Sequence, residues 1–410
     1  MRVVGRGVNS ASLMVMSVET TGVEAVVVSG RPRVPLGMLT LVKFLLSASL
    51  RLPYLFLGTV SRNLGISVAE GGRLLGLGEL AGVGSLIIGP SLDKGRHRRW
   101  FLTGMTAGIA GCAVMAGVHS PSGLLIGFAA VCLGVSLCTT SGHSFLGTEI
   151  PYAQRGRAIG LFETSWAGAL LVGAPVAAVA MRIIGWWSPW LIIALLVSVT
   201  VPVAAARMPI HGSAAHHEAV SDTTFEWRAV ISTVAASNLL TVGGVVVFST
   251  FGPWLQDVHG VKDFGLGAIA VGLGVMELMA SGGSAGYADR IGKRRSAWLG
   301  ALVMTGAALL LISFGNTSLV MAIAGIVLLF GGFEFGFVSL LSVVSEVGGG
   351  RRATVVGVDH AIVPMMRAGG AALGTLLYSR SGLRPVLVVC ILCALSSIVA
   401  VQASGAERSR

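Results

Sequence analysis

Five charged residues lie about ten or more positions inside long apolar stretches of this chain, at Arg51, Glu79, Glu277, Glu334 and Arg367. Carboxyl groups at such a depth can bind and release protons, and guanidinium groups can balance a charge or hold an acidic group of a ligand. A charge at the centre of a bilayer costs at least about 2.5 kcal/mol on insertion scales, so these residues should face a polar cavity or pair with one another. They therefore predict a site for transport and proton coupling, and a set of buried structural ion pairs is the alternative.

The composition places these residues in a membrane. Hydrophobic residues make up 54% of the 410 residues and charged residues only 11%, whereas about 25% of a typical soluble domain is charged. A chain with so few charges cannot cover itself with a water-compatible surface. The 58 glycines also suit closely packed transmembrane helices.

Apolar segments long enough for a spanning helix, roughly 20 residues, occur at twelve places. The first six are 36–57, 74–92, 100–118, 123–146, 158–181 and 186–206. The second six are 229–255, 264–287, 297–314, 319–344, 354–378 and 383–401. The sequence therefore predicts an all-α membrane protein with twelve transmembrane helices in two pseudo-symmetric six-helix bundles.

A polar interval divides the chain into two halves. Residues 207–228 are rich in Ser, Ala and His and show no apolar period, so we expect a cytoplasmic linker there. The bundles should then occupy 36–206 and 229–402. We expect a disordered cytoplasmic tail over 1–35 and a short one over 403–410.

The positive charges predict the orientation. Most of the 29 Lys and Arg residues fall on the side of the termini and the linker when the twelve spans are threaded in turn. Cytoplasmic loops carry such an excess, so we expect a multi-pass protein of the inner (plasma) membrane with both termini in the cytoplasm. The net charge of +11 then reflects membrane topology, and nucleic acid is not an expected partner.

Neither a cofactor nor a metal is expected. The five cysteines all lie within apolar runs, which argues against a disulfide framework and against a metal cluster. No G-x-x-x-x-G-K-[ST] loop is present, so ATP is not the direct energy source. No Ser, His and Asp arrangement of recognised spacing is present, which argues against an enzyme.

Two charged loops carry nearly the same pattern, GPSLDKGRHRR at 89–99 and AGYADRIGKRR at 285–295. In the first copy the pattern residues are Gly89, Asp93, Lys94, Gly95 and Arg96; in the second they are Asp289, Arg290, Gly292, Lys293 and Arg294. An aspartate at a helix end can accept hydrogen bonds from free amides at the N-terminus of a neighbouring helix. We therefore expect a gate contact at these loops, and the alternative is that the Lys and Arg residues only fix topology.

The doubled loop, in which a Gly precedes an Asp that is followed by Lys or Arg and then Gly, resembles the signature loop of the major facilitator superfamily. With the helix count, the resemblance covers 36–401. It implies two bundles that alternate access to a central cavity lined by helices 1, 4, 7 and 10. Arg51, Glu334, His143 and Asn238 should line that cavity, and Asp93 should contact helix 11 near Thr354.

A second stretch, 155–190, resembles helix 5 of the bacterial drug and sugar efflux branch, the drug:proton antiporters. The Gly and Pro that mark antiporters correspond to Gly173 and Pro175, here separated by one residue. The arginine typical of helix 4 in that branch is replaced by Ala130. The resemblance implies efflux, and this departure weakens the argument for proton antiport.

These observations favour proton-coupled export of a small amphipathic compound, with Glu334 as proton carrier and Arg51 as a substrate anchor or counter-charge. Lipid, a small-molecule substrate and protons are the expected partners. The alternatives are facilitated uptake or symport of a sugar or other metabolite, and a membrane receptor or scaffold that does not transport. Nearer the cytoplasmic helix ends, we expect Glu163, Asp359, His360 and Lys43 to be structural or gate residues, with a Lys43 side chain long enough to extend its ammonium to the lipid headgroups.

Overall fold

The structure, a computed structural model, describes residues 35–210, 226–347 and 352–403. Twelve helices within these ranges are long and apolar enough to cross a membrane, which confirms the predicted fold class. The spans of the first half are α1 (Leu36–Leu55) with α2 (Leu57–Leu64), α3 (Val68–Glu79) with η1 (Leu80–Ile88) and α4 (Gly89–Leu92), α5 (His97–Gly117), α6 (Pro121–Glu149), α7 (Tyr152–Gly168) with η2 (Ala169–Gly173) and α8 (Ala174–Ile183), and α9 (Ser188–Arg207). Those of the second half are α10 (Trp227–Phe248) with α11 (Phe251–His259), α12 (Asp263–Ile291), α13 (Lys293–Phe314), α14 (Leu319–Val347), α15 (Arg352–Ser381) and α16 (Leu383–Ala403).

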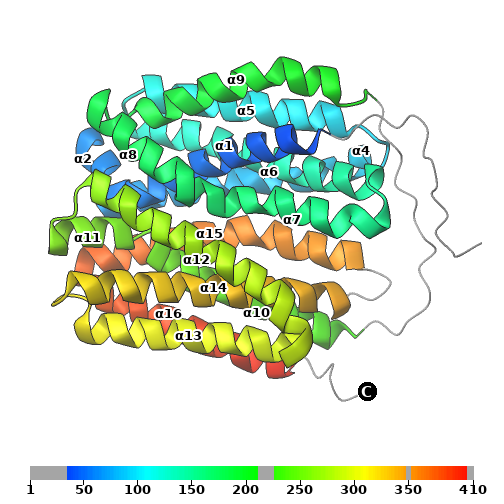
Figure 1. The fold of residues 1–410 in the computed structure, drawn as a ribbon. Helices are drawn as coiled ribbons and strands as arrows, with labels where there is room; N and C mark the ends of the chain where they lie inside the picture. The colour runs from blue at the N-terminus through cyan, green and yellow to red at the C-terminus, as the bar shows by residue number, and fades with distance from the viewer. Residues whose placement is uncertain (1–34, 211–225, 348–351, 404–410) are drawn as a thin grey trace, which may run out of the picture. The chain divides into compact units, whose positions relative to one another are not determined.

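The two ends of the helices need names. We call the end at which α9 stops and α10 starts the linker end, and the end that carries α2 and α11 the far end (Figure 1). The expected tails and most of the expected linker lie outside the described residues. The second span begins at Val68, six residues before its predicted start, because Ser67 caps the helix by accepting a hydrogen bond from the Glu70 amide at 3.1 Å.

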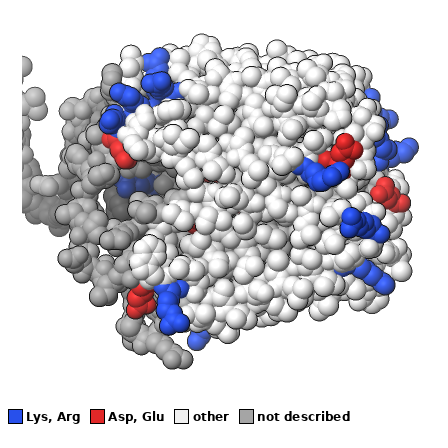
Figure 2. Space-filling model, turned by 180° about the vertical axis from the view of Figure 1, so that it is seen from behind, with Lys and Arg blue, Asp and Glu red and all other residues white. Residues whose placement is uncertain are grey.

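A wide band of uncharged surface crosses the face of the molecule seen in Figure 2. Figure 2 shows that the Lys, Arg, Asp and Glu side chains of the visible face gather toward its two ends, with other residues between them. Large apolar side chains such as Ile183 and Val199 are 75% and 72% exposed. Such exposure is unfavourable in water and favourable against lipid chains. The outer surface therefore fits the bilayer that the composition predicts.

The first span of each half is interrupted before it reaches the far end. α1 ends at Leu55, two residues after Pro53, and α10 ends at Phe248 before Pro253 in α11. Proline removes one backbone donor and its ring clashes with the preceding turn, so helices break or kink beside it. The matching interruptions are a second sign of the duplication that the charged loops indicate.

The fifth span contains a wide turn immediately before its proline. Residues 169–173, ending at Gly173, form the π-helical turn η2, and Pro175 follows in the first turn of α8. Proline cannot donate a backbone hydrogen bond to the preceding turn, and the wider π turn accommodates this missing bond. Gly274 of α12 packs against this turn, where a Cβ would lie 2.6 Å from the Leu171 amide nitrogen.

Glycines bring the two halves together on both sides of the molecule. Gly267 and Gly274 of α12 face the fifth span, and Gly72 and Gly76 of α3 face α15. A Cβ on Gly76 would lie 2.7 Å from the backbone oxygen of Ala368. Since a backbone atom cannot move aside as a side chain can, Gly76 and Gly274, whose nearest neighbours are backbone atoms, require glycine.

Gly76→Leu should therefore separate α3 from α15 and lower the thermal unfolding temperature of the purified protein by several degrees, since overpacking costs about 1–3 kcal/mol. Gly369→Leu is the matched control, because no atom lies within 4 Å of a Cβ at that α15 position. Equal unfolding temperatures for the two variants, measured by circular dichroism in detergent, would contradict this account of the packing.

Candidate functional site

The first of two ion pairs that join the halves lies near the middle of the helices. The Arg51 guanidinium donates from Nη2 to Glu277 Oε1 at 2.5 Å and from Nη1 to Glu277 Oε2 at 2.7 Å. Nη1 also donates to the backbone oxygen of Trp166 at 2.9 Å. Arg51 and Glu277 are each only 3% exposed. A two-pronged pair of this kind fixes α1 against α12 and compensates both charges away from water.

The second pair joins the halves on the opposite interface. Arg367 of α15 donates from Nε and Nη2 to Glu79 Oε1 at 3.0 and 2.8 Å. The Tyr54 hydroxyl donates to the same oxygen at 3.1 Å. Glu79 and Glu277 belong to the second span of their respective halves. Each of these carboxylates therefore pairs with an arginine of the opposite half.

An indole ring connects the two pairs. The guanidinium carbon of Arg51 lies 4.6 Å from the centre of the Trp166 ring, and that of Arg367 lies 5.6 Å from it. The Phe248 ring lies 5.1 Å from Arg51. Cations near aromatic faces are stabilised by the ring quadrupole, more strongly where water is excluded. Four of the five mid-membrane charges are thus committed to one another across the two halves.

Glu334, the fifth, has a different environment. Its side chain is 9% exposed and its Oε1 accepts a hydrogen bond from Ser281 at 2.7 Å. Among the described residues, no Lys, Arg or His forms an ion pair with it. It lies within electrostatic range of Glu277, Arg51 and Glu163. Glu334 is therefore a buried carboxyl group beside the paired charges without a counter-ion of its own in the described part of the chain.

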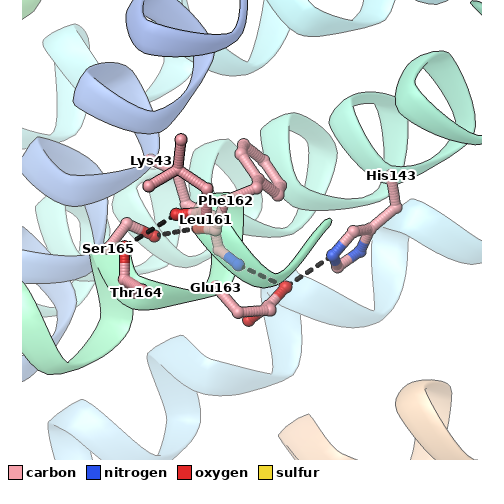
Figure 3. A network of polar contacts seen from close by, with 7 residues as sticks. All are labelled: Lys43, His143, Leu161, Phe162, Glu163, Thr164 and Ser165. Atoms are coloured by element: carbon pink, nitrogen blue, oxygen red, sulfur yellow. Dashed lines mark hydrogen bonds and ion pairs between the residues drawn. The ribbon is translucent and has the colours of Figure 1, made fainter. Parts of the chain in front are cut away.

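His143 belongs to a cluster at the linker-end side of the first half (Figure 3). Glu163 Oε1 lies 2.5 Å from His143 Nε2 and 2.6 Å from Lys43 Nζ. The expectation that Lys43 reaches the headgroups was wrong, because its side chain is 4% exposed and points inward at Glu163. Spacing alone missed this, since a lysine two turns from a helix end can extend either way.

Asn238 occupies the corresponding contact in the second half. Its amide donates to Asp359 Oδ1 at 3.0 Å, and the Ser237 hydroxyl donates to Oδ2 at 3.4 Å. Asn238 is 5% exposed and Asp359 fully buried. Each half thus holds an acid of its fifth span with a donor from its first span: Lys43 in the first half, and Asn238 and Ser237 in the second.

The two charged loops lie at the linker end. Asp93 and Lys94 are exposed, and Gly95 and Gly292 have positive φ of 73° and 97°, the left-handed region that favours glycine. Lys293 forms an ion pair with Glu346. The side chains of Asp289 and Thr354 lie outside the described residues, so the expected contact between Asp93 and helix 11 near Thr354 stays a prediction.

A polar network at the far end was not predicted. Gln256 of α11 donates to Thr59 Oγ1 at 3.0 Å and to Asp263 Oδ1 at 2.8 Å, and it accepts from Arg62 at 3.1 Å. Thr59 also donates to Asp263 Oδ1 at 2.5 Å. These four residues form a latch between the halves, at span ends where polar residues are ordinary and give no signal in the sequence.

Gln256→Ala should open the far end. The substitution removes three hydrogen bonds, and at about 1 kcal/mol for each bond even one raises the open population about fivefold. A cysteine at the buried position Thr250, with the native cysteines replaced, should then react faster with a membrane-impermeant maleimide. Gln402→Ala, at an exposed position of α16, should leave the rate unchanged, and equal rates for both variants would contradict a latch.

Comparisons with known proteins agree with this architecture. The family model of the Major Facilitator Superfamily matches residues 39–363. The chain is 25% identical over 320 residues to YwfA of Bacillus subtilis (strain 168), an uncharacterized MFS-type transporter, covering 75% of this chain and 76% of that protein.

The fold is similar to solved structures of a bacterial homolog of the human lysosomal transporter Spinster. The inward-facing, unoccupied form superposes with a TM-score of 0.71 at 16% identity, covering 92% of this chain and 98% of that one. The inward-facing, occupied form gives 0.66 at 17% identity, covering 90% and 94%. With twelve spans, duplicated halves and a family model matching most of its length, the chain belongs to the major facilitator superfamily and is a transporter, not an enzyme.

Proposed function

We propose that the protein exports a small amphipathic compound in exchange for protons, by alternating access between the two halves. The observation that carries this proposal is Glu334, a buried carboxyl group without a described counter-ion beside two ion pairs that join the halves. A secondary transporter draws its energy from gradients, and a carboxyl group in such a place is the simplest means of coupling to protons.

The coupling follows from the cost of burying charge. An ionised carboxylate that loses water on closure of the cavity is unfavourable unless a proton or another cation neutralises it. A proton and a basic group of the substrate therefore compete for Glu334, and only the neutralised site passes through the closed state. Such competition moves the two species in opposite directions.

The surroundings of Glu334 suit a molecule that is both apolar and charged. Phe333 and Phe337 of α14 stack with ring centres 5.7 Å apart on either side of it in sequence. Phe248 and Phe330 meet edge to face at 5.5 Å, with Phe248 beside Arg51. Aromatic surfaces with a few charged groups are typical of sites for amphipathic ligands. Arg51 is committed to Glu277 in this conformation, which supports a counter-charge role over a substrate anchor.

The direction rests on two further arguments. The excess of Lys and Arg supports a cytoplasmic linker end. The hydrogen bonds that join described residues of the two halves lie near the middle of the helices or in the far-end latch. At the linker end, by contrast, the side chain of Glu163 is 47% exposed. These features support a conformation that receives substrate from the cytoplasm, and the resemblance of 155–190 to the efflux branch supports export.

A substrate panel and a proton measurement test the proposal. Cells that overproduce the protein should accumulate less of at least one amphipathic compound than cells that lack it. In vesicles holding a pH dye, adding that compound should move protons opposite to it. Movement in the same direction would indicate symport, and the absence of any proton movement would exclude proton coupling.

A further inference from the structure

The cluster of Lys43, His143 and Glu163 combines a buried cation with two exposed groups. The Lys43 side chain is 4% exposed, whereas those of His143 and Glu163 are 31% and 47% exposed. The Phe162 ring lies beneath them, with Lys43 Nζ 4.4 Å and the His143 ring 5.2 Å from its centre. Lys43 therefore keeps the Glu163 carboxylate in place from the inside (Figure 3), while the exposed fractions of His143 and Glu163 show that these two side chains remain accessible.

The geometry assigns the nitrogen of His143 that exchanges its proton. An ionised carboxylate can only accept hydrogen bonds, so Nε2, 2.5 Å from Glu163 Oε1, must carry a hydrogen. In the neutral ring Nδ1 then holds the free lone pair. A carboxylate that fixes one nitrogen of an imidazole and leaves the other free is the arrangement of a proton acceptor.

The charged groups around His143 can be named by element. α1 supplies Lys43 and, deeper, Arg51, while α7 supplies Glu163. α3 supplies Glu79, which is committed to Arg367, and α5 supplies His97, which meets the Phe145 ring edge to face at 5.9 Å. From the second half, Glu334 of α14 lies within electrostatic range of Glu163 and of Glu277.

Whether the net charge of the Lys43, His143 and Glu163 cluster balances the negative charge of Glu334 depends on one proton, the one that His143 can bind. With neutral His143, the cluster sums to zero. The ionised carboxylate of Glu334, which lies within electrostatic range of Glu163, is then a single negative charge to be enclosed when the linker end closes. With His143 protonated, the cluster is positive and compensates Glu334. Enclosing a compensated pair is far less costly than enclosing a single charge.

We propose that His143, oriented by Glu163 and held by Lys43, is a proton-binding site separate from Glu334, and that its protonation favours the state in which the linker end is closed. This inference rests on the proposed proton coupling. In the second half the acid of the corresponding contact, Asp359, is fully buried beneath Asn238 and Ser237, whereas Glu163 and His143 of the first half are partly exposed.

Distances between spin labels test the inference without a substrate. Label pairs at exposed positions report the two ends: Asn63 with Lys262 at the far end, and Arg99 with Arg295 at the linker end. In lipid nanodiscs, lowering the pH from about 8 to about 5.5 should raise the linker-end-closed population of the wild type at least about threefold. His143→Gln should abolish this shift, whereas His119→Gln, a histidine of the same half that contacts Trp186, should retain it.

Two more variants separate the possible failures. Glu163→Gln leaves Lys43 buried without a carboxylate and can impair folding, so the double variant Lys43→Met with Glu163→Gln is used to remove the orienting group. It should weaken the shift as His143→Gln does. Glu334→Gln should reverse the shift, because the positive cluster then has no partner across the gap.

The proposal is overturned if wild type shows no shift, or if His143→Gln shifts as wild type does. If His143→Gln shifts as wild type does, but lowering the pH leaves the closed population of Glu334→Gln unchanged or reduces it, the proposed function stands without the role of His143. Proton movement absent from the vesicle assay overturns the proposed function itself.

Discussion

Replacing Glu277 by Gln should destabilise the folded protein by about 3–5 kcal/mol, because it leaves the Arg51 guanidinium buried without its counter-ion. Among the described residues, the groups left to stabilise that charge are the neutral amide oxygen of the new Gln, the backbone oxygen of Trp166 and two aromatic faces, and none of them carries a negative charge. Unfolding in mixed micelles, followed by circular dichroism against the fraction of denaturing detergent, measures the loss.

Two comparisons make the expectation specific. Glu346→Gln breaks an ion pair whose side chains are 61% and 30% exposed, so it should cost less than about 1 kcal/mol. The double variant Arg51→Met with Glu277→Met removes both charges and should recover most of the stability, since buried pairs are often replaced by apolar residues at little cost. A Glu277→Gln variant as stable as Glu346→Gln would contradict the burial and pairing described for Arg51.

The double variant also separates structure from function. Alternating access requires the halves to move about their contacts, and Arg51 and Glu277 lie on opposite sides of one of those contacts. A stable double variant that transports as wild type does would identify the pair as structural, which is the alternative reading of the mid-membrane charges. We expect the double variant to transport more slowly than wild type, because Glu334 loses the two charged side chains that lie within electrostatic range of it.

Sequence patterns predicted the helices and the depth of the charges because both depend on local properties. Long apolar runs predict spans, and Arg51, Glu79 and Glu277 stand out by lying far inside them. Their partners depend on which faces of α1, α3, α12 and α15 meet, and the glycines that decide this have meaning only once the opposite helix is known. Pairing therefore required the structure.

The cluster at His143 could not be predicted from the sequence either, because its charged residues lie near span ends. Lys43 and Glu163 lie near span ends, where solvent or headgroups are the ordinary partners of charge, and the first span was expected to send Lys43 outward. In the structure Lys43 is enclosed and Glu163 remains half exposed. The far-end latch of Thr59, Arg62, Gln256 and Asp263 was missed for a similar reason, since polar residues at helix ends carry no depth signal.

Glu334→Gln should abolish gradient-driven transport while leaving the fold intact. Gln has nearly the same shape as Glu and its amide oxygen can still accept the Ser281 hydrogen bond, so the variant should insert and unfold as wild type does. It cannot bind or release a proton. In vesicles, accumulation of a transported compound driven by a proton gradient should fall at least about tenfold, the effect of removing the coupling step.

Movement of the compound down its own gradient should persist in Glu334→Gln, because a neutral residue at position 334 imitates the protonated site, which the proposed cycle allows to close. It should need a higher concentration of the compound, because the aromatic rings remain but the charge that competes for its basic group is lost. This separation of the two modes is the signature of a coupling residue, since a variant damaged in folding or in binding loses both. Ser281→Ala provides the control: it removes only the hydrogen bond to Glu334 and should retain gradient-driven transport at a reduced rate. Persistent proton-driven accumulation in Glu334→Gln would show that the proton is carried elsewhere, and the exposed imidazole of His143 is then the next group to replace.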